Sequence, residues 1–89
     1  MSTPRHIDQI KNADQTVAYL DARGWAYSVP DDEERQLWPH WKPTVWPPVR
    51  KDGQPTKRAM EMHRELCRRG LLGPLKRDEL GGLCAEVQS

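Results

Sequence analysis

The chain has 89 residues, of which 36% are hydrophobic and 30% charged, with no phenylalanine and a formal net charge of +1. This length predicts a single small domain over 1–89 with a thin core, and the near-zero net charge argues against wholesale disorder. The N-terminus lacks the apolar stretch of a secretory signal, and no run approaches the roughly 20 apolar residues of a membrane span. We therefore expect a soluble cytoplasmic protein without a membrane partner.

The first helix is predicted over 4–23. Apolar side chains recur through this segment at steps of three and four residues, as they do on one face of a helix. Pro4 suits the first helical position, and Gly24 suits the stop. Asn12 can cap a second start, so the alternative is a division there, with a separate helix over 13–23.

Two short strands and a short helix are predicted next. Residues 25–29 alternate in character as a half-buried strand does, and residues 44–46 are the candidate partner. Prolines flank 44–46, so we expect this strand at a sheet edge. Acidic residues crowd the start of 31–38, which favours a short helix that ends before Pro39.

Two further helices are predicted in the second half of the chain. Residues 57–69 place their apolar side chains on one face, after an N-cap at Thr56. A third helix should begin at Pro74 and continue to Val87, although Gly81 and Gly82 weaken it by about 1 kcal/mol each.

The resulting fold prediction is mostly α. It is a small helical domain of two to four helices with a Trp/Pro-rich crossover over 38–56 and a short two-stranded β element. The last residues, 85–89, are expected to form a disordered tail.

Tryptophan and proline are concentrated in one segment, WPHWKPTVWPPV, over 38–49. Proline stiffens the backbone, and tryptophan has a large apolar surface that suits either a small core or an anchor for a partner. Both interpretations stay open for Trp38, Trp41 and Trp46. Trp41 is the one expected to be exposed, because its neighbours His40 and Lys42 are polar.

Charge is also unevenly distributed. Residues 49–77 hold nine basic and three acidic residues, a local charge of +6. Two of the basic residues begin the predicted 57–69 helix, the end at which its dipole disfavours cations. The candidate partner-binding residues are therefore Trp38, Trp41, Trp46, Arg50, Lys51, Lys57, Arg58 and Arg64.

Catalytic and metal-binding patterns are weak in this sequence. It has no GxSxG, glycine-rich phosphate loop or HExxH, so we expect no enzyme and no cofactor. His40, His63, Cys67 and Cys84 could together bind zinc, but their spacing resembles no zinc motif. A packed core is the favoured interpretation, and a Cys67–Cys84 disulfide is a further alternative.

These observations predict a non-enzymatic protein-binding module. It would act as a regulator or inhibitor by occupying the surface of a partner protein, as accessory proteins of phages or bacteria can. The alternative is a nucleic-acid-binding accessory protein that uses the basic 50–69 segment. A subunit of a larger assembly or homo-oligomer is the third hypothesis.

Overall fold

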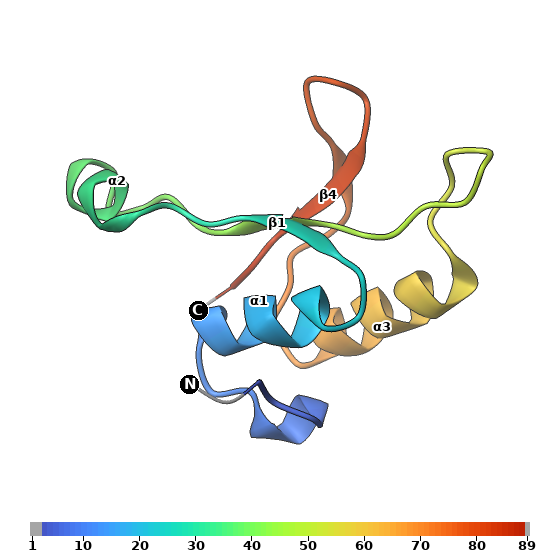
Figure 1. Cartoon of the computed structure of the whole chain (residues 1–89), viewed down its shortest axis with the longest axis horizontal. Helices are drawn as coiled ribbons and strands as arrows, with labels where there is room; N and C mark the ends of the chain where they lie inside the picture. The colour runs from blue at the N-terminus through green and yellow to red at the C-terminus, as the bar shows by residue number, and fades with distance from the viewer. Residues whose placement is uncertain (1–2, 89) are drawn as a thin grey trace.

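The computed structural model describes residues 3–88, and this part of the chain has an α+β architecture (Figure 1). Its four strands form one antiparallel sheet in the order β1-β2-β4-β3. The predicted mostly α fold is therefore wrong, because the domain combines its helices with a four-stranded antiparallel sheet. The elements in chain order are η1 (Ile7–Gln9, a 3₁₀ turn), α1 (Ala13–Asp21), β1 (Ala26–Ser28), α2 (Asp32–Leu37), β2 (Thr44–Trp46), α3 (Lys57–Arg68), β3 (Lys76–Arg77) and β4 (Leu83–Glu86).

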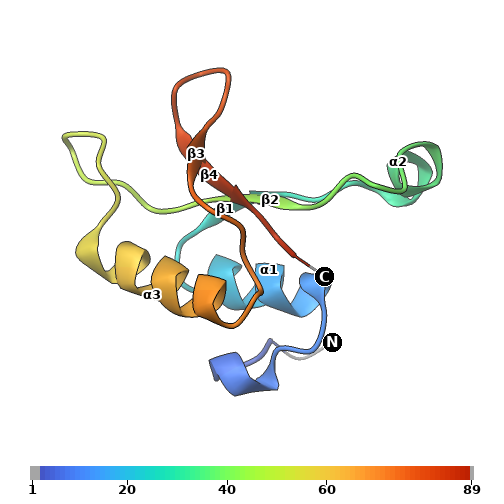
Figure 2. The same cartoon turned by 180° about the vertical axis from the view of Figure 1, so that it is seen from behind.

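The helices α1 and α3 lie on one side of the sheet (Figures 1 and 2). Their buried side chains meet those of the sheet in one core, in which Leu20, Leu66 and Val45 are fully buried. Burying each of these side chains stabilises the fold by about 1.5–3 kcal/mol. The buried core residues are Val17, Leu20, Trp25, Val45, Ala59, Leu66, Leu72, Ala85 and Val87.

The pairing of 25–29 with 44–46 is confirmed, but β2 is an inner strand and not an edge strand. Ala26 of β1 lies opposite Trp46, and Thr44 lies opposite Glu86 of β4. The prolines fall just outside the three paired residues, so they remove no ladder hydrogen bond. Pro43 even extends the pairing, because its carbonyl accepts a hydrogen bond of 2.8 Å from the Val87 N–H.

Helix starts follow the local sequence closely. Asn12 caps α1 by accepting a 2.9 Å hydrogen bond from the Gln15 N–H, which confirms the predicted alternative of a division there. Thr56 caps α3 in the same way, with 3.1 Å from the Ala59 N–H. The segment before Asn12 is not a helix over 4–12 but contains only the 3₁₀ turn η1, since Ile10 is already extended.

The predicted third helix is also wrong, because the chain forms the β3–β4 hairpin there. Gly81 has φ +84°, a left-handed conformation that reverses the chain and that glycine adopts without steric cost. The Asp78 carboxylate supports this turn by accepting hydrogen bonds from the N–H groups of Leu80 (2.9 Å) and Gly82 (2.7 Å). Ala85 and Val87, expected in a disordered tail, are fully buried instead, while Ser89 lies outside the described residues.

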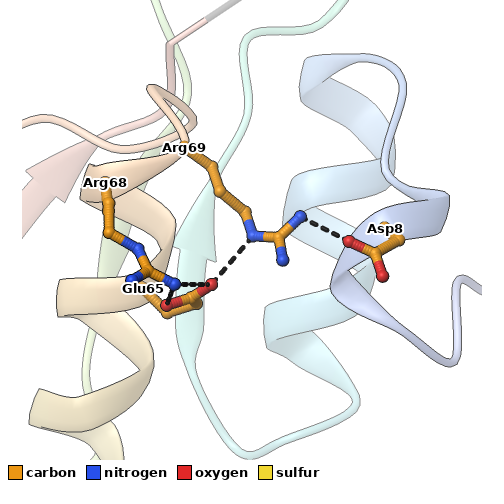
Figure 3. Close-up of polar contacts among 4 residues, drawn as sticks. All are labelled: Asp8, Glu65, Arg68 and Arg69. Carbon is orange, nitrogen blue, oxygen red and sulfur yellow. Dashed lines mark hydrogen bonds and ion pairs between the residues drawn. The ribbon is translucent and has the colours of Figure 1, made fainter.

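An ion-pair network ties η1 to the end of α3 (Figure 3). Arg69 donates to Asp8 of η1 and, at 3.0 Å, to Glu65 one turn earlier in α3. Arg68 donates to both carboxylate oxygens of Glu65, at 2.8 and 2.6 Å. The hydrogen bonds from Arg68 and Arg69 lower the pKa of Glu65. The cationic charge at this end of α3 is thus already compensated within the chain.

Candidate functional site

The connection between β1 and β2 extends away from the rest of the molecule and carries α2 at its far end (Figures 1 and 2). We call residues 31–42 the arm. Every residue of the arm is exposed except Glu34, which is half-buried, and α2 has no buried residue. The arm therefore contributes little to the core. Two exposed polar contacts link it to the body, Arg35 with Asp14 at 3.2 Å and Lys42 with Gln88 at 2.7 Å.

Local sequence explains the shape of the arm. Asp31 caps α2 through a 2.8 Å hydrogen bond from the Glu34 N–H, and α2 is the short helix that the acidic start of 31–38 predicted. Trp38 ends the helix, as expected for the residue before Pro39. The Trp41 N–H then donates to the Trp38 carbonyl at 3.0 Å, which turns the chain back towards β2.

This turn brings two of the predicted tryptophans together. The rings of Trp38 and Trp41 meet edge to face, with centroids 5.9 Å apart and planes at 83°. Trp38 is 55% exposed and Trp41 46%, so the expectation that Trp41 would be exposed is confirmed. Leu37 beside them is 69% exposed. The side chains of Leu37, Trp38 and Trp41, which we call the arm tip, line an open groove. Glu34, Pro39 and His40 complete the lining of this groove.

The other tryptophans have different environments. Trp25 is 3% exposed and belongs to the core. Trp46 alternates with the core residue Val45, so it lies on the sheet face away from the helices. Its indole N–H donates a 2.9 Å hydrogen bond to Asp78, and this bond lowers the pKa of that carboxyl group. Trp46 therefore links β2 to the turn between β3 and β4 and is not part of the arm tip.

The predicted basic residues lie at the opposite end of the molecule from α2. Arg50 and Lys51 occupy the turn before α3, and Lys57, Arg58 and Arg64 lie on α3 itself. In Figure 1 this turn and the start of α3 are at the right of the longest dimension, whereas α2 is at the left. The structure thus separates the eight candidate residues into the arm tip, a basic group and Trp46.

The cations of the 49–77 segment differ in their pairing. Arg50 forms an ion pair with Asp52 at 3.3 Å, and Lys76 forms one with Glu86 at 2.6 Å. Arg68 and Arg69 are paired as described above, and Arg77 is exposed but donates to the Gly81 carbonyl at 2.8 Å. The four remaining cations are exposed and form no ion pair within residues 3–88. They are Lys51, Lys57, Arg58 and Arg64, and we call them the basic end.

Sequence reasoning missed Leu37 and Asp78. Leu37 is an apolar residue on an otherwise polar short helix, directly before Trp38, and this position could have indicated it as part of the same patch. Asp78 carries no such signal. Its role depends on the contact with Trp46, which lies 32 residues earlier in the chain.

Of the four candidate zinc ligands, only His63 and Cys67 contact each other, and both are half-buried. The Cys67 Sγ lies 3.2 Å from His63 Nε2, and both contact the Gly73 carbonyl oxygen, at 3.3 and 3.0 Å. Burial raises the pKa of the Cys67 thiol and of the Cys84 thiol, which disfavours their reactive thiolate forms. Both cysteines are free, and within residues 3–88 no three potential ligand side chains are grouped as a metal site.

Comparisons with models of protein families, with curated proteins and with solved structures find no match for this chain. In the part of the chain that the structure describes, no helix has the length and apolar character needed to cross a membrane.

Proposed function

We propose that this protein is a binding module that inserts its arm tip into an apolar pocket of a partner protein. By occupying that pocket it would regulate or inhibit the partner. The proposal is supported by one observation above all: Leu37, Trp38 and Trp41 are clustered and exposed at the end of an arm that adds little to the core. Exposed apolar clusters of this kind commonly mark interaction sites, and tryptophan is enriched among binding hot spots.

Covering the exposed rings of Trp38 and Trp41 by a partner should contribute a large binding free energy for so small a surface. A tryptophan side chain buries about 150–250 Å², and roughly half of each indole is exposed here. Covering about 100 Å² on each ring would contribute about 2.5 kcal/mol per tryptophan at about 25 cal/mol per Å². The edge-to-face contact and Pro39 hold the two rings in place before binding, which reduces the entropy lost on docking.

Charge next to the arm tip indicates the chemistry of the partner. Asp31, Asp32 and Glu33 are exposed at the start of α2, and none forms an ion pair within residues 3–88. A partner pocket rimmed by lysine or arginine would complement this acidic edge and accelerate association. The partner we propose is therefore a protein with an apolar pocket and a basic rim.

Capture from nuclease-treated source lysate tests this function when the arm is varied. The wild-type protein should retain a partner, and W38A/W41A should lose it. The matched control is L80A, which removes a side chain that is 96% exposed but lies in the β3–β4 turn. D32K/E33K should weaken capture while leaving the tryptophans intact. Equal capture by the wild type and W38A/W41A would contradict the proposed role of the arm.

A further inference from the structure

We propose a second binding site at the basic end, for the phosphate backbone of double-stranded nucleic acid. The site consists of Lys51, Lys57, Arg58 and Arg64, which are all exposed. It lies at the opposite end of the molecule from the arm tip, and it does not depend on the proposed binding of a protein there (Figure 1).

Lys57 and Arg58 lie at positions that are electrostatically unfavourable when no ligand is bound. Lys57 and Arg58 occupy the first turn of α3, where the positive end of the helix dipole disfavours them. No acidic side chain within residues 3–88 forms an ion pair with them, whereas Arg68 and Arg69 at the other end of α3 are fully paired. An incoming phosphate would supply the missing negative charge and interact favourably with the cations and with the helix dipole.

Two of the four cations share one face of α3, and Arg58 lies next to Lys57 in its first turn. Lys57 and Arg64 are seven residues apart, so they lie on the same face of α3, about 10 Å apart along its axis. Lys51 lies in the turn of the loop that leads into α3, and the Thr56 N–H closes the base of this loop by donating to the Pro48 carbonyl at 3.1 Å.

Nucleic acid suits this surface better than an acidic protein does. Protein interfaces are depleted in lysine and usually contain an aromatic anchor, whereas lysine and arginine are the usual contacts to phosphate. A duplex suits it better than a single strand, because single strands are typically bound by stacking bases on aromatic rings. The exposed tryptophans that could serve in this way, Trp38 and Trp41, are at the far end of the molecule (Figure 1).

The salt dependence of the duplex-binding constant provides a quantitative test of the proposed site. Each cation that neutralises a phosphate contributes about −0.9 to the slope of log K against log salt concentration for duplex DNA. Four contacts predict a slope of about −3.6, which weakens binding about 150-fold between 50 and 200 mM salt. The K57Q/R58Q/R64Q variant should retain a slope of about −0.9, a loss of only about 3-fold over the same range.

Fluorescence anisotropy of a labelled DNA duplex, titrated with the full chain at several salt concentrations, measures these slopes. The control for a cation elsewhere is K11Q, which removes one exposed cation before α1, away from the start of α3, and should bind as the wild type does. E61Q should bind more tightly, because Glu61 is the exposed acidic residue between Lys57 and Arg64 on α3. Far-ultraviolet circular dichroism checks that each variant is folded.

Three outcomes would overturn the proposal. These are no duplex binding at 50 mM salt, an unchanged slope in K57Q/R58Q/R64Q, or binding to polyglutamate as tight as binding to the duplex. The last result would indicate an acidic protein as the ligand. W38A/W41A should bind the duplex normally, so this site and the arm can fail or succeed separately.

Discussion

The clearest test of the division between core and arm is the effect of each tryptophan on stability. Trp25 is 3% exposed in the core, whereas Trp38 and Trp41 are 55% and 46% exposed on the arm. Trp25→Ala removes buried contacts and leaves a cavity, which typically costs about 3–5 kcal/mol. Because small domains are stable by only about 5–15 kcal/mol, this variant should be severely destabilised or unfolded.

The arm variants should behave differently. Trp38→Ala removes the edge-to-face contact with Trp41, which contributes about 0.5–1.5 kcal/mol. That contact lies within the arm, so its loss should affect global unfolding by no more than about 1 kcal/mol, a shift in Tm of about 4–8 °C at most. W38A/W41A should therefore remain folded while it loses its partner.

Urea denaturation followed by far-ultraviolet circular dichroism measures both effects without depending on tryptophan fluorescence. The reasoning requires Trp25→Ala to be much less stable than W38A/W41A. If W38A/W41A lost as much stability as Trp25→Ala, the arm tip would be part of the folding core, and its exposure could not support a binding function.

Three further predictions concern the scaffold. Thr56→Ala should cost about 1 kcal/mol in urea unfolding, because it removes the N-cap of α3; no change would mean that the cap contributes nothing. The hydrogen bond from the Trp46 indole lowers the pKa of Asp78 below its ordinary value of 3.8. The ionised carboxyl group therefore stabilises the fold above pH 3.8, and this stabilisation is lost as the pH falls through the lowered pKa. Trp46→Phe should therefore show a smaller loss of stability on acidification, measured by urea midpoints at successive pH values, and an identical pH profile would count against this link. Burial raises the pKa of Cys67 and Cys84, so both thiols should react slowly with iodoacetamide near neutral pH until urea unfolds the protein. Mass spectrometry measures the extent of labelling. Rapid labelling of the native protein would contradict the burial of these thiols.

Local sequence signals predicted the starts of α1, α2 and α3, although they also predicted helix over 4–12 and from Pro74, where none forms. Asn12 and Thr56 each cap a helix where expected, because a capping side chain interacts with backbone only three residues away. Asp31 caps the helix that the acidic start of 31–38 predicted. The periodic apolar residues of 57–69 likewise correspond to α3, Lys57–Arg68. Such interactions form within one or two helical turns, so their residues are adjacent in the sequence.

The same local approach failed from Pro74 onwards. The spacing of Leu80, Leu83 and Val87 fits a helix, but it also fits a turn followed by a strand. The hairpin forms because β4 pairs with β2, about 40 residues earlier, and because Gly81 reverses the chain. Helical periodicity contains no information about that distant partner, so the strand could not be distinguished from a helix.

The candidate site was predictable only in part. The sequence indicated tryptophan anchors and a basic segment, and it identified Trp41 as exposed. It could not show that Trp46 would turn away to bind Asp78, or that the cations would lie at the other end of the molecule. Both facts depend on the course of the chain through the sheet, which the neighbours of each residue do not determine.

The sequence by itself determined the capped starts of α1 and α3, the short helix α2 and which side chains could serve as anchors or cations. Capping depends on short-range backbone chemistry, and anchors and cations are defined by residue type. The tertiary structure decided that the sheet has four strands, that 31–42 projects as an arm and that anchors and cations are separated. Strand pairing joins residues far apart in the chain, and burial depends on every element that covers a side chain. Exposure, and with it the potential to bind, is therefore a property of the whole fold.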